Sequence, residues 1–274
     1  MDINSLVMAY FSPTKTTKRV IEAICEGIDV SKTYNLDLTK PKGADSNTSY
    51  NEIGQLVIIG APVYSGRLPQ DAVDRLRCLE GNNRPAIVVV VYGNRAYEDA
   101  LLELKDLAVE LGFKPIAAAA FIGEHSFSTG ETPIAVGRPD AADIIKAAEF
   151  GKDIMRQVAS AATIADLELM SDKLNVPGNF PYKDRKESPP ISPITIEEKC
   201  NKCGVCVQVC PTMAIYLEDS VITNVKACIR CCACIKECPT DARVMEHPKM
   251  VEIAQWLHSS CGLRKETEIY LHIH

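Results

Sequence analysis

One spacing of cysteines occurs twice, in Cys200-Asn-Lys-Cys203-Gly-Val-Cys206-Val-Gln-Val-Cys210-Pro211 and in Cys228-Ile-Arg-Cys231-Cys232-Ala-Cys234-Ile-Lys-Glu-Cys238-Pro239. Both copies read C-x2-C-x2-C-x3-C-P. The chain has 274 residues and 12 cysteines, and only Cys25 and Cys78 precede the first copy. The N-terminus has no basic segment of the kind that begins a secretory signal, so we expect a cytoplasmic protein. In that compartment, clustered thiols indicate metal binding or redox chemistry and not a disulfide framework.

The repeated spacing is the bacterial ferredoxin motif, whose thiolates hold [4Fe–4S] clusters. In this motif the first three cysteines of a copy bind one cluster and the fourth binds the other, so the expected ligand sets are crossed. Paired C-x2-C motifs also form zinc ribbons, but these use two pairs of thiolates and not triplets followed by Cys-Pro. One cluster is expected on Cys200, Cys203, Cys206 and Cys238, and the other on Cys228, Cys231, Cys234 and Cys210.

Four cysteines remain outside the two ligand sets. Cys25 falls on an apolar helical face and is predicted to be a small core residue. Cys78 and Cys261 belong to no motif. Cys232 stands beside Cys231 and could replace it by a shift of register, but the spacing is complete without it, so we interpret Cys232 as a free thiol. Between the two copies, residues 214–217 and 221–225 are predicted to form a short hairpin.

Residues 1–160 alternate short apolar runs with helical stretches. The runs are rich in Val and Ile and end at Gly or Pro, which is typical of strands buried on both faces of a parallel sheet. The alternation predicts an α/β fold, a doubly wound five-stranded parallel sheet. Strands are expected at 6–10, 33–38, 56–60, 86–92 and 116–122, and helices at 16–27, 70–79, 98–111 and 140–159.

Such a sheet binds ligands at the carboxyl ends of its strands, so the loops that follow the runs are candidates. Residues 11–17 are rich in hydroxyl groups and lead into a helix, which suits a phosphate but also an ordinary helix cap. Residues 61–69 and 93–97 each combine a tyrosine, which can stack on a flat ring, with a glycine and an arginine. The absence of G-x-G-x-x-G after the first run argues against an NAD site.

Together these three loops resemble the FMN site of flavodoxins. The whole chain resembles the flavodoxin–ferredoxin fusion family, through Tyr10-Phe-Ser-Pro-Thr, Pro62-Val-Tyr-Ser-Gly-Arg and Tyr92-Gly-Asn-Arg-Ala-Tyr in addition to the cysteine motifs. Lys15 replaces a glycine of the family's phosphate loop. The resemblance implies that FMN binds at Ser12, Thr14, Lys15, Thr16, Thr17, Pro62, Val63, Tyr64, Ser65, Gly66, Arg67, Gly93, Asn94, Arg95 and Tyr97.

Three charged or titratable groups near these loops have two interpretations each. Arg67 and Arg95 could pair with FMN oxygens or belong to a solvated surface. His125 follows the fifth run and could reach the flavin or a substrate, or it could be a solvated loop residue. No catalytic residue is predicted.

The sequence divides into four parts. We expect a flavodoxin-like FMN-binding domain at 1–160, a Pro-rich linker at 161–194, a small α+β ferredoxin-like two-cluster domain at 195–243, and a helical tail at 244–274 that contains Trp256. The hydrophobic fraction of 46% excludes general disorder, and the net charge of −6 argues against a nucleic-acid binder. No apolar run approaches the roughly 20 residues that a membrane-spanning helix needs.

These features predict an iron–sulfur flavoprotein that transfers electrons between two [4Fe–4S] clusters and FMN, with redox proteins as partners. The alternative is an FMN-dependent reductase of a small organic acceptor, supplied by its ferredoxin domain. A non-redox module stabilised by metal is disfavoured by the doubled motif. The chain could also form a homo-oligomer.

Overall fold

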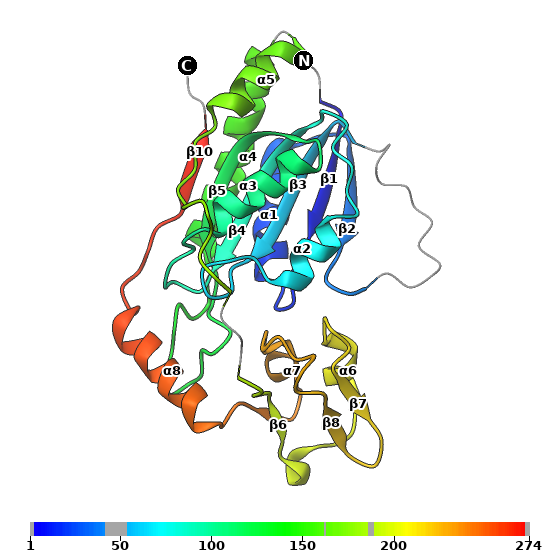
Figure 1. The fold of residues 1–274 in the computed structure, drawn as a ribbon, viewed down its shortest axis with the longest axis vertical. Helices are drawn as coiled ribbons and strands as arrows, with labels where there is room; N and C mark the ends of the chain where they lie inside the picture. Colours follow the sequence, from blue (N-terminus) through cyan, green and yellow to red (C-terminus); the bar gives the residue numbers. More distant parts are fainter. Residues whose placement is uncertain (1–2, 42–53, 162, 186–188, 272–274) are drawn as a thin grey trace.

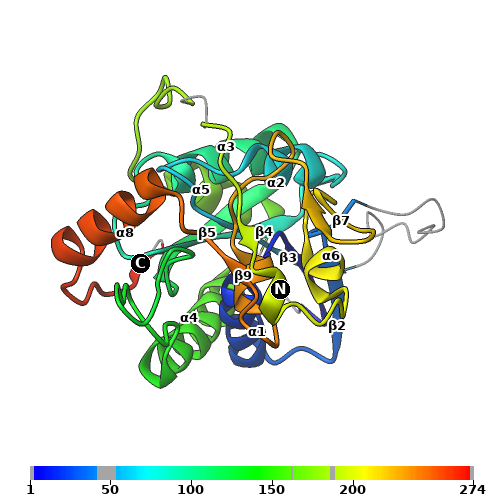
Figure 2. The same cartoon turned by 90° about the horizontal axis from the view of Figure 1, so that it is seen from below.

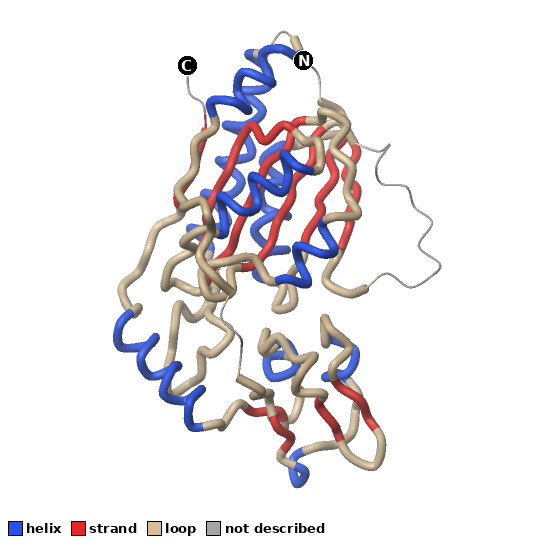
Figure 3. Tube along the Cα trace, in the orientation of Figure 1, coloured by secondary structure: helices blue, strands red, loops and turns tan. Residues whose placement is uncertain are grey.

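The computed structural model describes residues 3–41, 54–161, 163–185 and 189–271. An α/β domain built from the N-terminal half lies above a small cysteine-rich domain in Figure 1. The tube in Figure 3 shows that the strands of the upper domain run side by side, between helices.

The upper domain is built on a six-stranded sheet of order β10-β5-β4-β3-β1-β2. Its five N-terminal strands pair in parallel, which confirms the predicted doubly wound sheet. Their order, 2-1-3-4-5, is that of flavodoxin-like folds and reverses direction between β1 and β3. The strands are β1 (Ser5–Tyr10), β2 (Lys32–Asp37), β3 (Leu56–Pro62), β4 (Pro85–Tyr92) and β5 (Lys114–Ile122).

The sixth strand was not predicted. It is β10 (Glu268–Leu271), which pairs antiparallel with β5 so that Glu268 faces Ala120 and Leu271 faces Ala117. The predicted count of five strands is therefore corrected, and the predicted helical tail contains a strand in addition to its helix. Without β10, β5 would be an edge strand with unpaired backbone groups. Four residues are too short a segment for periodicity to distinguish a strand from a loop.

Helices cover both faces of the sheet. A correction concerns α5, which falls inside the predicted linker. Its start is fixed by a capping box, since Thr163 Oγ1 accepts from the Asp166 amide while the Asp166 carboxylate accepts from the Thr163 amide. One face carries α1 (Thr16–Ile28), α4 (Ala141–Ser160) and α5 (Ile164–Lys173), and the other carries α2 (Gln70–Leu76) and α3 (Ala100–Glu110).

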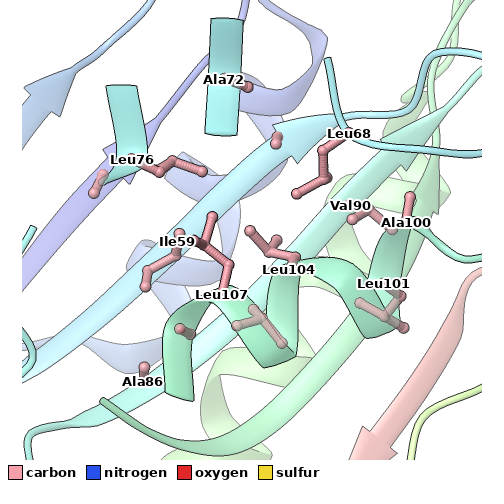
Figure 4. Close-up of a cluster of buried hydrophobic side chains, with 14 of the residues drawn as sticks. Ile59, Leu68, Ala72, Leu76, Ala86, Val90, Ala100, Leu101, Leu104 and Leu107 are labelled. Carbon is pink, nitrogen blue, oxygen red and sulfur yellow. The ribbon is translucent and has the colours of Figure 1, made fainter. Parts of the chain in front are cut away.

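Neighbouring residues of one strand enter different cores. Ile59 packs with Leu76 and Leu104 under α2 and α3, as Figure 4 shows. Ile58 packs instead with Ile24, under α1 and α4. Burial on both faces fixes the register of the strands, because a shift by one residue would exchange the two sets. The loops after β1, β3, β4 and β5 consequently meet at one edge of the sheet, which faces the small domain (Figure 1).

The cysteine-rich domain has two short antiparallel pairs, β6 with β9 and β7 with β8. The second pair is the predicted hairpin. The chain then forms a long helix, which lies at one side of the view from below in Figure 2, and the segment after this helix rises to β10 of the upper domain (Figure 1). None of the helices in the described ranges is long and apolar enough to cross a membrane. The elements are β6 (Ile194–Thr195), η2 (Glu197–Lys199), α6 (Val205–Val209), β7 (Ile215–Leu217), β8 (Val221–Thr223), α7 (Ala233–Lys236), β9 (Arg243–Val244) and α8 (Pro248–Ser260).

Candidate functional site

A cleft of about 670 Å³ opens at the carboxyl edge of the parallel strands. Its walls come from the loops after β1, β3, β4 and β5, from the segment before β6, from the second cysteine motif and from α8. Nine of the predicted cofactor residues line it: Thr14, Thr16, Pro62, Val63, Tyr64, Ser65, Arg67, Gly93 and Arg95. The other six, Ser12, Lys15, Thr17, Gly66, Asn94 and Tyr97, lie outside its lining.

The loop after β1 is shaped by a left-handed residue. Lys15 has φ 64° and ψ −1°, the conformation that a glycine at this place would adopt without strain. The Ser12 hydroxyl accepts a hydrogen bond from the Lys18 amide at 3.1 Å, which closes the loop onto α1. Thr14 and Thr16 then flank Lys15 and face the cleft beside the N-terminus of α1. The hydroxyls and the helix terminus together can hold a phosphate.

Two of the predicted residues hold the C-terminal segment. The Asn94 side-chain amide donates to the carbonyls of Cys261 and Leu263, at 2.6 and 2.9 Å. The Tyr97 hydroxyl donates to the Glu268 carboxylate at 2.7 Å. Tyr92, at the end of β4, lines the cleft instead. The aromatic wall expected from Tyr97 therefore comes from Tyr92.

The two cleft arginines that were predicted to contact FMN are paired within the protein. Arg67 forms a two-point contact with Glu103, in which Nε donates to one carboxylate oxygen at 2.8 Å and Nη2 to the other at 2.9 Å. Arg95 Nη1 donates to Glu98 at 2.5 Å. Because each cation has a carboxylate partner, these side chains bring N–H donors to the cleft and little net charge.

His125 stands against the loop after β4. A Cβ atom on Gly93 would lie 2.3 Å from the His125 ring, so only glycine fits there. His125 Nδ1 accepts from the Phe127 amide at 3.0 Å, which assigns the ring proton to Nε2. Burial, aided by the positive charges of Arg95 and Lys236, lowers the pKa of His125 to about 4. The ring is therefore a neutral donor at pH 7.

The cysteine motifs form two groups of thiols. One small cavity is lined by Cys200, Cys203 and Cys206 of the first copy and Cys238 of the second. In the other group, burial raises the pKa of Cys231. The neighbouring thiols of Cys234, Cys210 and Cys228 raise this pKa further. Each group combines three cysteines of one copy with the fourth of the other.

Cys232 occupies a special backbone position. With φ 60° it precedes α7, just as Gly204 with φ 75° precedes α6 in the first copy. Its side chain is buried, and its Sγ lies 3.5 Å from the Arg230 carbonyl oxygen. A cysteine thus stands where the first copy has glycine.

Residues of the second motif contact the upper domain. Lys236 Nζ lies 2.5 Å from the Glu124 carboxylate, and Lys15 Nζ lies 2.7 Å from the carboxylate of Glu237. Ile229 packs against the hydrophobic core beneath α2 and α3. The second motif is therefore held against the edge of the sheet where the cleft opens.

Comparison with known protein families finds one match. Residues 192–254 match the family described as 4Fe-4S dicluster domain. The strand order of the upper domain, 2-1-3-4-5, is that of flavodoxin-like folds. The chain thus joins a flavodoxin-like fold to a segment that is similar to the 4Fe-4S dicluster domain family.

Solved structures resemble the flavodoxin-like domain. A flavodoxin from the domain Archaea has 16% identity and a TM-score of 0.40, covering 57% of this chain and 99% of its own. Flavodoxin 1 from Bacillus cereus has 19% identity and a TM-score of 0.40, covering 56% and 97%. The flavodiiron protein from Giardia intestinalis has 14% identity and a TM-score of 0.38, covering 62% and 37%. A comparison with curated proteins found no match.

Sequence reasoning missed two walls of the cleft. Lys183 and Arg185, which precede the dicluster domain, carry no recognisable pattern. Ile253, Trp256 and Leu257 project from α8, whose helical spacing was visible but gave no sign of which side it would face. The flavodoxin-like domain therefore supplies only part of the cleft, and the rest comes from segments that flank or belong to the dicluster domain.

Proposed function

We propose that this protein transfers electrons between two [4Fe–4S] clusters and an FMN. The supporting observation is that Cys228 and its neighbours Ile229 and Arg230 line the same cleft as Tyr64 and Tyr92. A cofactor in the cleft and a cluster on the second motif would therefore be neighbours without any rearrangement.

The thiol groups fit the clusters. Each has three cysteines from one copy and one from the other, as the ferredoxin motif requires. In the parts of the chain that the structure describes, no three His, Cys, Asp or Glu side chains converge on a single metal ion. The doubled C-x2-C-x2-C-x3-C-P spacing favours a cluster with several irons over a zinc ion. Cys203 is exposed, which places one proposed cluster within reach of a partner protein.

The cleft fits FMN. Thr14 and Thr16 present hydroxyls beside the N-terminus of α1, where a phosphate is stabilised by amides and by the helix dipole. Tyr64 and Tyr92 offer flat rings. Burial, together with the thiols of the second motif, raises the pKa of Tyr64, so its phenol stays protonated. Bound flavin would supply one- and two-electron chemistry, while the protein sets its position.

The two proposed cluster sites and the cleft follow one another in space. The cavity with the exposed Cys203 is at one end, the group around Cys231 follows, and the cleft is at the other end. A redox protein that docks near Cys203 could exchange electrons with the cleft through the two clusters.

One observation favours a second candidate function, an FMN-dependent reductase of a small organic acceptor. Ile253 and Trp256 of α8 extend the cleft with an apolar wall beyond the loops expected to hold FMN. Turnover of a quinone or nitro compound with reduced ferredoxin would favour the reductase. Electron exchange with proteins alone would favour the carrier.

The deciding experiment is anaerobic purification followed by an absorption spectrum and by iron, sulfide and flavin analysis. We expect a yellow-brown protein with about eight irons, eight sulfides and one FMN per chain, since each cubane contributes four irons. A colourless protein that contains zinc would refute the proposal. Anaerobic handling matters because the folding of such a domain is coupled to its metal.

A further inference from the structure

The two cysteine motifs continue beyond their prolines into a matched pair of segments. The first reads Cys210-Pro-Thr-Met-Ala-Ile215 and the second Cys238-Pro-Thr-Asp-Ala-Arg243. Their backbones correspond as well, because the Ala214 and Ala242 amides donate to the preceding cysteine sulfurs at 3.2 and 3.3 Å. Ile215 and Arg243 are therefore equivalent positions, at which one copy has an apolar side chain and the other a cation.

Arg243 is as deeply buried as its apolar counterpart, with 2% of its surface exposed against 3% for Ile215. Its guanidinium is held in place by neutral oxygens. Nη1 donates to the Thr195 hydroxyl at 2.6 Å, and Nη2 donates to the Thr223 hydroxyl at 2.9 Å and to the Pro193 carbonyl at 3.0 Å. These contacts fix the position of the charge but do not neutralise it.

Arg243 lies between the two thiol groups. It lines the cavity of Cys200, Cys203, Cys206 and Cys238, and its Nη2 lies 3.9 Å from Cys234 Sγ of the other group. Its Nε–H is buried and has no hydrogen-bond partner in the described structure.

A buried cation without a counter-charge is costly. No carboxylate of the described residues pairs with Arg243; its hydrogen-bond partners are two hydroxyls, a carbonyl and a thiol. The missing negative charge is the one that clusters ligated by four thiolates would bring. The unpaired Nε–H is likewise a donor available to an acceptor at these sites.

We propose that Arg243 is a shared counter-cation of the two clusters and raises the reduction potential of both. This inference rests on the proposed function, because it requires two bound clusters. Reduction adds one negative charge to a cluster, and a fixed positive charge nearby stabilises the reduced form. Net charge and hydrogen bonds to sulfur are among the factors that set such potentials.

The test is a redox titration of the anaerobically purified holoprotein, followed by paramagnetic resonance, for wild type and Arg243→Met. We expect both midpoints to fall, so that the ratio of reduced to oxidised cluster at a given potential drops about tenfold, which is 59 mV for one electron. Arg243→Lys keeps the charge, so it should recover at least half of the fall in midpoint potential that Arg243→Met causes.

Two further variants separate charge from structure. Thr223→Val removes a neutral partner of Arg243 and keeps the cation. The ratio of reduced to oxidised cluster at a given potential should therefore stay within about twofold of wild type. If Arg243→Met does not assemble clusters, Arg243→Gln replaces it, with an N–H donor but no charge and with the same expected fall. Iron and sulfide analysis of wild type shows separately whether two clusters are present.

Three results would overturn the role of Arg243 in a wild type that does hold two clusters. They are unchanged midpoints in a fully loaded Arg243→Met or Arg243→Gln, a shift of one midpoint alone, and equal shifts in the Met and Lys variants. The last of these would assign the effect to packing instead of charge.

Discussion

The Lys15 ammonium lies 2.7 Å from the Glu237 carboxylate and joins the loop after β1 to the second cysteine motif. Lys15 is the residue that replaces the glycine of the flavodoxin phosphate loop. It adopts a left-handed backbone, with φ 64°, and its side chain reaches Glu237 of the second motif and does not line the cleft. Lysine at this position therefore carries backbone strain that glycine would avoid, and it forms an ion pair between the two domains.

The backbone at Lys15 predicts an order of stability for two substitutions. Lys15→Gly and Lys15→Ala both remove the ammonium and its exposed ion pair, which contributes at most about 1 kcal/mol. Only glycine relieves the left-handed strain of about 1–2 kcal/mol. We expect Lys15→Gly to melt about 2–4 °C above Lys15→Ala in thermal unfolding of the holoprotein.

Lys18 provides the matched control for this prediction. It lies within α1, where glycine is less favourable than alanine by about 1 kcal/mol, so Lys18→Gly should melt below Lys18→Ala. The same order at both positions would contradict the role assigned to the backbone of Lys15.

The hydroxyl of Thr14 gives a prediction about FMN. Thr14→Ala removes a donor from the proposed phosphate site, and a hydrogen bond to a charged group contributes about 1.5–3 kcal/mol. FMN affinity, measured by quenching of flavin fluorescence, should fall by roughly 10- to 100-fold. Thr132→Ala is the control, since its hydroxyl contacts Thr129 outside the cleft. Equal affinities for wild type and Thr14→Ala would remove the loop after β1 from the FMN site.

Sequence reasoning predicted the parts of this protein that are repeated or periodic. The buried strands appeared because Val and Ile recur between glycine and proline, and the cysteine motifs because their spacing follows from the shape of a cluster. The same reasoning failed where position depends on tertiary contacts. β10 pairs with β5, and even the closest matched pair, Glu268 with Ala120, is separated by 148 residues (268 − 120). No local pattern contains such a relationship.

The candidate site divides in the same way. Tyr64 and Arg95 were predicted to bind FMN, and the structure places both in the lining of the cleft. Tyr97 was predicted there too, but its hydroxyl donates to Glu268 of β10 and thus depends on the strand that was missed. Trp256 was visible on a helix, but which surface that helix covers depends on how the chain returns to the upper domain.

The crossed ligand sets predict a selective defect. Cys210 belongs by sequence to the first copy, but its thiol lies with those of Cys228, Cys231 and Cys234. The variant tested is Cys210→Ala. We expect the variant to lose or alter the cluster of the second copy and to keep the other, as seen by paramagnetic resonance of the reduced protein. Selective loss of the cluster on Cys200, Cys203 and Cys206 would overturn the crossing.

Cys232→Ala is the companion variant. Cys232 stands where the first copy has glycine and is not needed to complete either ligand set. Iron and sulfide contents should therefore match those of wild type. A loss of about four irons in this variant would instead make Cys232 a ligand.

His125 predicts how the cleft responds to pH. Its pKa is lowered to about 4, whereas an ordinary histidine titrates near 6.5. As the pH falls from 6.5 toward 4, the unfolded chain takes up this proton before the folded one, so the stability contributed by the neutral ring is lost over that window. Above pH 6.5 that contribution is complete.

The measurement is nuclear magnetic resonance of histidine-labelled holoprotein between pH 5.5 and 8. We expect the His125 ring to remain neutral, with the proton on Nε2, because Nδ1 accepts from the Phe127 amide. Arg95→Gln removes one of the positive charges that lower this pKa, so the pKa of His125 should rise in that variant. A wild-type His125 that titrates near 6.5 would contradict the burial that lowers this pKa.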